Sequence, residues 1–143
     1  MDCDQRLVLP PTPLSVRRGR HLVIDTVPGC GFEDLTDLAA LLTSEALTNA
    51  VIHARTTLEL MIRCQEDLLI TVTDCDRTAI LTPIASAGLD SLLNDPDLDS
   101  ESGRGLVLIA TLAHDWGITT HPHGKTLWFT LVPPRDDTCD IAV

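Results

Sequence analysis

The sequence predicts an α/β fold, a two-layer sandwich in which helices cover one face of a mixed, mostly antiparallel sheet. Two segments of alternating polarity, residues 58–64 and 68–74, are separated by a short polar turn and therefore predict an antiparallel hairpin. A second pair of alternating segments lies near the end of the chain, and segments with helical spacing precede each hairpin. This order of strands and helices favours one sheet with all helices on the same side.

The first part of the chain predicts one strand and two helices. Residues 6–9 form a short apolar run that two prolines end, which is typical of an edge strand because proline donates no ladder hydrogen bond. Pro13 suits the first turn of a helix that ends near Pro28. After a glycine-containing loop, Asp34 is the predicted N-cap of a long helix that runs to about residue 54.

The second half predicts a long acidic segment, one helix and a final hairpin. Residues 75–102 hold two prolines and several carboxylates with weak periodicity, and a loop of this length in a compact domain is often a functional lid. A helix is expected from Gly103 to about residue 113, followed by strands at 116–120 and 126–132.

Length and composition limit the classes of function. The 143 residues fit one domain, expected at residues 1–134, followed by a flexible charged tail at 135–143. The net charge of −11 argues against nucleic acid or an anionic membrane as a partner, because no basic surplus is present to neutralise phosphates. The five cysteines, an odd number without a CxxC pair, favour reduced thiols and a cytoplasmic protein. No segment resembles a signal peptide or is apolar for long enough to span a membrane.

The long helix has polar side chains within its predicted buried stripe. Stepping by four and three residues, this stripe contains Leu38, Leu42, Glu45, Asn49 and Ile52. A carboxylate that faces a core is strongly destabilising unless it is paired or binds something. Glu45 and Asn49 lie one turn apart, so this face predicts a polar pocket in which the two side chains hold a metal ion and position or deprotonate a nucleophile.

Three further features are candidates for a ligand site, although each taken alone also has a simple structural explanation. Asp74 ends a predicted buried strand, where it either accepts a hydrogen bond from an amino group or simply ends the strand in a turn. Gly103 and Gly105 let a helix start approach a ligand closely and favour phosphate, although glycines are also common at helix entries. The sequence GKT at 124–126 begins the last strand, where a hairpin turn is the simplest explanation.

Together, the order and spacing of these segments resemble a known pattern. SEALTNAVIHA is similar to the N box, VTDCD to the first glycine box, SGRGLVLI to the second and GKTLWFTL to the last box of the ATPase superfamily that includes histidine kinases, gyrase B and MutL. The resemblance covers about residues 7–131 and implies a Bergerat-type ATP-binding fold. Within the superfamily, the chain looks most like the small bacterial anti-sigma-factor serine kinases.

The resemblance implies a role for each residue that matches a box. Asn49 would bind the Mg²⁺ that bridges the ATP phosphates, and Glu45 would be the general base toward a protein hydroxyl or water. Asp74 would recognise the adenine amino group.

The last two boxes supply the remaining implied contacts. Gly103 and Gly105 would contact the phosphates, with Arg104 as the nearest basic residue. Thr126, or the neighbouring Lys125, would support the adenine end.

The first glycine box departs from the usual pattern of the superfamily, because Asp76 and Thr78 stand where glycines are habitual. Glycines at these places permit a tight backbone turn beside the nucleotide. The segment that follows is strongly acidic, and carboxylates near a triphosphate repel it unless cations compensate.

The resemblance therefore implies an ATP- and Mg²⁺-dependent protein serine/threonine kinase that regulates transcription as an anti-sigma factor. Its partners would be a sigma factor and an anti-anti-sigma (antagonist) protein that receives the phosphoryl group. The alternative is a non-catalytic protein-binding module with a degenerate nucleotide site. Relatives of this type commonly form homodimers, so a homodimer is a further expectation.

Overall fold

The computed structural model describes residues 3–53, 56–74, 100–122 and 124–133. Its strands are β1 (Cys3–Leu9), β2 (Leu58–Cys64), β3 (Leu68–Asp74), β4 (Asp115–His121) and β5 (Gly124–Leu131). Its helices are α1 (Pro13–Thr26), α2 (Thr36–His53) and α4 (Ser100–Leu112), and two 3₁₀ turns, η1 (Pro28–Cys30) and η2 (Glu33–Leu35), connect α1 to α2. The predicted lid, apart from its last residues, and the predicted tail lie outside the described residues. Within the described ranges, no helix combines the length and the apolar character needed to cross a membrane.

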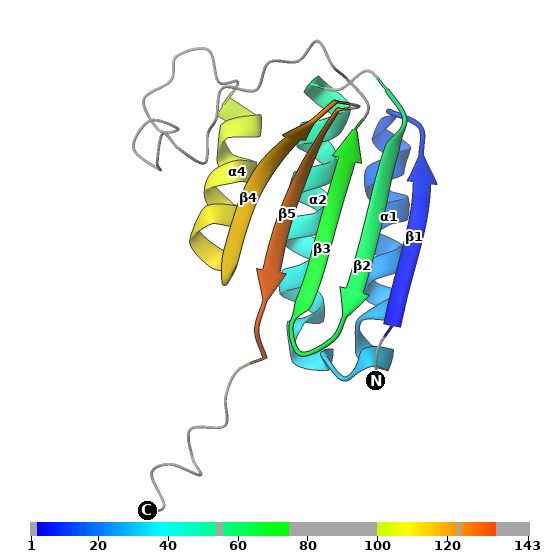
Figure 1. Cartoon of the computed structure of the whole chain (residues 1–143), viewed down its shortest axis with the longest axis vertical. Coiled ribbons are helices and arrows are strands. Elements are labelled where there is room, and N and C mark those ends of the chain that lie inside the picture. The colour runs from blue at the N-terminus through cyan, green and yellow to red at the C-terminus, as the bar shows by residue number, and fades with distance from the viewer. Residues whose placement is uncertain (1–2, 54–55, 75–99, 123, 134–143) are drawn as a thin grey trace, which may run out of the picture.

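The strands form one sheet in the order β1-β2-β3-β5-β4, and the pairings between the described strands are antiparallel. Helices α1, α2 and α4 lie on one face of this sheet, with α2 between the other two (Figure 1). The predicted two-layer α/β sandwich is therefore confirmed. Strand β1 occupies an edge of the sheet, as the prolines after it indicated.

Side chains of the central strands alternate between a buried face and a partly exposed face. On β2, Leu58, Leu60 and Ile62 are fully buried, whereas Glu59 and Arg63 point to the opposite face. Strands β3 and β5 follow the same period, so one face of the sheet forms the core with the helices. Full burial of one such aliphatic side chain stabilises the fold by about 1.5–3 kcal/mol.

The open face of the sheet is polar where β1 meets β2. Arg6 Nε lies 3.2 Å from Glu59 Oε1, and Arg63 Nε lies 3.4 Å from Asp4 Oδ1. All four side chains are substantially exposed, so each ion pair contributes less than about 1 kcal/mol. The position of β1 therefore depends mainly on backbone pairing and on the leucines of its other face.

The predicted elements are present in the structure, but several of their bounds differ. Strand β1 begins at Cys3, three residues earlier than predicted. Strands β2 and β3 have the predicted bounds, and Pro13 opens α1. The prediction that Asp34 caps the long helix is wrong, because Asp34 lies inside η2 and α2 begins at Thr36. The physical reason is burial, since the 3₁₀ turn brings Phe32 and Leu35 into the core.

The buried stripe of α2 also differs from the predicted one at its end. Asn49 is buried and Glu45 is half-buried, as predicted. Ile52 is 41% exposed, so its predicted burial is wrong. The side of α2 that faces the sheet includes Ala46 and Ala50, and the helical period turns Ile52 away from that side.

The final hairpin is longer than predicted. Strand β4 begins one residue earlier than expected and reaches His121, which pairs with Gly124 at the start of β5. The predicted four-residue turn is therefore shortened from both ends. Gly124 has a φ of +147°, a conformation that glycine adopts readily and other residues rarely do.

Glycine at position 19 permits close packing of α1 on α2. A Cβ placed on Gly19 would lie 2.2 Å from Leu47 Cδ1 and 3.1 Å from Leu60 Cδ2. Leu47 and Leu60 are fully buried, so neither side chain has open space to move into. The short distance between the two helices therefore requires a residue without a side chain at this position.

The substitution Gly19→Val is expected to lower the free energy of unfolding by about 1–3 kcal/mol, because the added methyl groups overpack the contact with Leu47. Urea denaturation measures this difference. Gly29→Val is the matched control, since nothing lies within 4 Å of a Cβ at Gly29. Equal losses in the two variants would show that the α1–α2 contact tolerates a side chain.

Candidate functional site

Helix α2 carries polar residues into the middle of the fold, where it packs between α1 and α4. Asn49 is buried on the sheet side, and Glu45 lies half-buried one turn earlier. Two other polar residues of this segment are satisfied by the helix itself: Ser44 Oγ and Thr48 Oγ1 donate to carbonyl oxygens one turn earlier at 2.9 and 2.7 Å. These two hydroxyls therefore have partners within α2, whereas the buried Thr43 Oγ1 has no hydrogen-bond partner among the described residues. Glu45 and Asn49 are the side chains of this segment whose chemistry suits proton transfer and a hard metal ion.

A small cavity lies between α2 and the adjoining ends of β3 and β5. Its volume is about 10 Å³, which is room for about one water molecule. Three polar residues and five apolar residues line it: Asn49, Asp74 and Lys125, with Ala46, Ala50, Val72, Ile118 and Leu127. The structure thus brings together two residues that the sequence placed in the site, Asn49 and Asp74, although they lie on different elements.

An ion pair is buried in the wall of this cavity. Asp74 and Lys125 are directly opposite each other on β3 and β5, and Lys125 Nζ lies 3.7 Å from Asp74 Oδ2. Asp74 is 3% exposed and Lys125 is 6% exposed. Lys125 Nζ has no hydrogen-bond partner among the described residues. Removal of an ammonium from water without hydrogen bonds is costly, so this group is ready to donate to an acceptor that enters the cavity.

Thr126 points away from this cavity. Its Oγ1 lies 2.9 Å from Thr73 Oγ1 and 3.2 Å from His121 Nε2. Because successive side chains of a strand alternate, Thr126 and Lys125 occupy opposite faces of β5. Of the two residues that the sequence offered for the adenine end, Lys125 is the one that lines the cavity beside Asp74. A nucleotide contact by Thr126 stays a prediction.

Glu45 lies at the contact between α2 and α4. A Cβ placed on Gly105 would be 2.9 Å from Glu45 Oε2 and 3.3 Å from Glu45 Cβ. The two helices approach closely here, so a side chain at position 105 would displace the carboxylate of Glu45. This contact gives Gly105 a structural role that is independent of any phosphate. Glu45 is not among the residues that line the cavity, but it is one helical turn from Asn49, which does line it.

The start of α4 differs from the predicted one. The helix begins at Ser100, three residues before the predicted start at Gly103. Only the first four N–H groups of a helix lack a partner within the helix. In α4 the N–H of Gly103 is the last of these four, and the N–H of Gly105 is not among them. The side chains of residues 100–104 lie outside the described part of the structure, so Arg104 has no described side-chain position. Phosphate contacts by Gly103, Arg104 and Gly105 stay predictions.

The residues around the cavity fit a purine nucleotide and Mg²⁺ by their chemistry. Asp74 accepts and Lys125 donates a hydrogen bond, and the edge of adenine presents an amino donor next to a ring-nitrogen acceptor. The amide oxygen of Asn49 is a hard ligand of the kind that Mg²⁺ prefers. A volume of about 10 Å³ does not hold a base, so nucleotide binding requires this part of the cavity to open. Asp76 and Thr78, the departures in the first glycine box, lie outside the described residues.

The substitution Lys125→Met is expected to lower the free energy of unfolding by about 3–5 kcal/mol, because it leaves the carboxylate of Asp74 buried without its ammonium. The double variant Asp74→Asn/Lys125→Met should lose less than the single variant. Urea unfolding of both measures the coupling between the two groups.

The matched control is Arg63→Met, which removes a strand cation from an exposed ion pair and should cost less than about 1 kcal/mol. A Lys125→Met protein as stable as the original chain would show that the buried pair does not hold this end of the sheet together.

Comparison with known families identifies the fold. The family model described as "Histidine kinase-like ATPase domain" matches residues 9–131, a region that extends from the last residue of β1 to the last residue of β5. A search of curated protein sequences gave no match. The superfamily resemblance seen in the sequence boxes is thereby confirmed, because the matched region includes Glu45, Asn49, Asp74 and the glycines of α4. Since the model matches well over half of the chain, this protein belongs to the histidine kinase-like ATPase domain family.

Proposed function

We propose that this chain binds ATP together with Mg²⁺ and transfers the γ-phosphoryl group to a serine or threonine hydroxyl of a partner protein. The observation that carries the proposal is the meeting of Asn49, Asp74 and Lys125 at one cavity, with Glu45 one helical turn away. The family supports nucleotide binding, since domains of this kind bind ATP, generally with Mg²⁺. The specific reaction rests on Glu45, the carboxylate one turn before Asn49.

At the base end of the site, two neighbouring charges offer complementary hydrogen bonds. Asp74 accepts a hydrogen bond from the adenine amino group, and Lys125 donates one to the adjacent ring nitrogen. This assignment uses the ammonium that has no hydrogen-bond partner among the described residues. It also relieves part of the cost of burying the pair, because a bound base supplies the polar contact that the cavity lacks.

At the phosphate end, each of two side chains on α2 has one task. The amide oxygen of Asn49 would hold Mg²⁺, which when bound would supply positive charge to the phosphate oxygens. Glu45 takes the proton of the acceptor hydroxyl while that oxygen bonds to the γ-phosphorus and the bond to the departing ADP breaks. The half-buried position of Glu45 against Gly105 restricts its rotamers and so orients the carboxylate.

The partners that suit this reaction are a sigma factor, which the chain would sequester, and an antagonist protein that accepts the phosphoryl group. The support is the resemblance of SEALTNAVIHA, SGRGLVLI and GKTLWFTL to anti-sigma-factor serine kinases. The net charge of −11 also favours a protein partner over nucleic acid, because the chain lacks a surplus of cations to bind phosphates.

A second candidate function is a protein-binding module that does not turn over ATP. One observation favours it: the carboxylate assigned to adenine is already engaged by Lys125, in a cavity of about 10 Å³. If the cost of opening this ion pair exceeds what a nucleotide recovers, the fold would serve partner binding alone. Nucleotide binding measurements distinguish the two functions directly.

Isothermal titration with ATP is expected to show binding that strengthens when Mg²⁺ is present. At an ATP concentration one hundred times Kd, linkage adds about 2.7 kcal/mol to the free energy of unfolding, which raises Tm by roughly 5–10 °C. A melting curve with Mg·ATP checks this in the same samples. No heat of binding and no shift of Tm at millimolar ATP would leave the binding module as the function.

Two variants separate metal binding from chemistry. Asn49→Ala should abolish the Mg²⁺-dependent part of ATP binding, whereas Thr48→Ala, the adjacent control, should preserve it because Thr48 bonds to its own helix. Glu45→Gln retains the shape of the side chain against Gly105 and should leave binding intact while phosphotransfer falls by about 10²–10⁴-fold. The rate of ADP formation, with and without an antagonist-type protein, is the readout. Undiminished turnover by Glu45→Gln would remove Glu45 from the role of base.

A further inference from the structure

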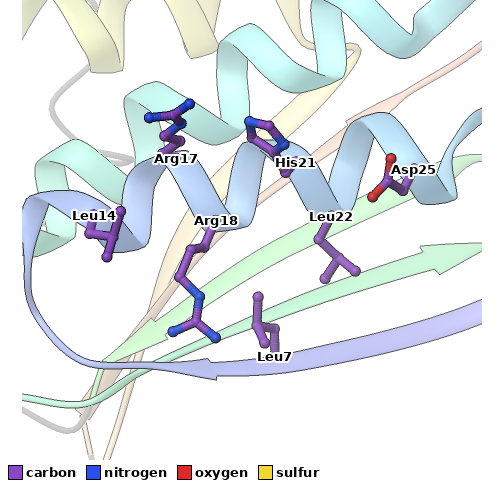
Figure 2. A pocket seen from close by; sticks show the side chains of 7 residues that line it. All are labelled: Leu7, Leu14, Arg17, Arg18, His21, Leu22 and Asp25. Carbon is purple, nitrogen blue, oxygen red and sulfur yellow. The ribbon is translucent and has the colours of Figure 1, made fainter.

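A groove of about 450 Å³ lies between α1 and the edge strand β1 (Figure 2). Leu7 of β1 forms one side of it, and α1 contributes residues from Leu14 to Asp25. Figure 2 shows Leu14, Arg18 and Leu22 on the side of α1 that faces β1, with Leu7 opposite them. The groove is built from elements that share no residue with the cavity at Asn49.

The groove is basic although the whole chain is acidic. Arg17 and Arg18 line it, and with Arg20 they place three of the ten Lys and Arg residues within a single turn of α1. None of these three arginines forms an ion pair with a carboxylate among the described residues. Asp25, near the C-terminal end, is the one acidic residue of α1. The groove therefore presents arginine side chains whose charge is not neutralised by the described part of the chain.

The surface beside Arg18 is apolar, whereas Arg17 extends from the other side of α1 (Figure 2). Leu14 is 62% exposed, and it lines the same groove as Leu7 and Leu22. Leu7 and Leu22 are half-buried and complete the floor with their outward sides. A purely charged ligand would leave these leucines without apolar contacts, and a purely apolar ligand would leave the arginines without a counter-charge.

We propose that this groove binds a short acidic segment of a partner protein, with apolar side chains on Leu7, Leu14 and Leu22 and carboxylates paired with Arg17 and Arg18. Charge complementarity carries this assignment, because planar guanidinium groups pair with carboxylates through two parallel hydrogen bonds. The apolar floor requires that the segment also carry aliphatic or aromatic residues. The groove shares no lining residue with the cavity at Asn49, so a peptide bound in it would not compete with a nucleotide for the same side chains.

Other occupants fit these observations less well. Nucleic acid and anionic membranes carry extended negative charge, which the net charge of −11 repels, and they supply no aliphatic side chains for the leucines. A second copy of the chain, docked symmetrically on this face, would bring the arginines of both copies together. A short acidic and apolar peptide avoids both conflicts because it contributes few charges and places them locally.

Selection from a library of random short peptides tests this proposal without assuming a partner. The full chain is used as bait, and enriched peptides are then titrated by fluorescence anisotropy against three variants. Arg17→Glu/Arg18→Glu reverses the charge in the groove, Leu14→Ser removes exposed apolar surface, and Arg20→Glu is the control, since Arg20 is exposed on the same helix but does not line the groove. All four positions are exposed, so folding should be unaffected, and circular dichroism verifies this.

The expected result is enrichment of peptides that combine Asp or Glu with Leu-like residues. Their binding should weaken about tenfold or more in Arg17→Glu/Arg18→Glu, and clearly in Leu14→Ser, while Arg20→Glu retains most of the affinity. Rising NaCl should also weaken binding. Three outcomes would overturn the proposal: no enrichment that depends on Arg17 and Arg18, selection of neutral or basic peptides, or self-association in sedimentation that the double variant abolishes. Because none of these measurements includes ATP, a failure here is separate from a failure of the proposed kinase activity.

Discussion

The packing of α2 between the sheet and two outer helices is the constraint on which the rest of the structure depends. Small residues make it possible, because Gly19 admits Leu47 from one side and Gly105 admits Glu45 from the other. Alanines at 46 and 50 bring the helix close to the strands. Since α2 cannot rotate without clashes on three sides, Asn49 is fixed toward the sheet and Glu45 toward α4. The geometry of the candidate site is thus a consequence of helix packing.

The buried pair of Asp74 and Lys125 links stability to ligand binding. Such a pair is weak support for stability, because desolvation of two charges offsets much of their attraction. The pair instead suits selective binding, since a carboxylate acceptor beside an ammonium donor matches only ligands that present a donor next to an acceptor. The same pair also closes the cavity to about 10 Å³. Whether a nucleotide binds therefore depends on the cost of opening this end of the site relative to the contacts that the nucleotide provides.

The two surfaces proposed to bind ligands are lined by different residues of the fold. One lies between α2 and the ends of β3 and β5, and the other lies between α1 and the edge strand β1. Their chemistry differs as well, because the first is a buried polar cavity and the second is an exposed groove with uncompensated arginines. A regulator with these two surfaces can bind a nucleotide and a partner at the same time, since neither ligand would occupy residues of the other's site.

Local patterns determined much of this structure. The period of two in β2 and β3 gave both strands with the observed bounds, Pro13 placed the start of α1, and the spacing of Glu45, Asn49 and Asp74 indicated the family that the family model confirms. Several features depend on contacts between distant segments, which no local pattern contains. The burial of Phe32 and Leu35 replaced the expected cap at Asp34 by a 3₁₀ turn. The register of β3 with β5 set Lys125 against Asp74 and turned Thr126 to the other face. The approach of α4 to α2 gave Gly105 a packing role that its sequence motif did not indicate, because a close contact between two helices exists only after both have docked on the sheet.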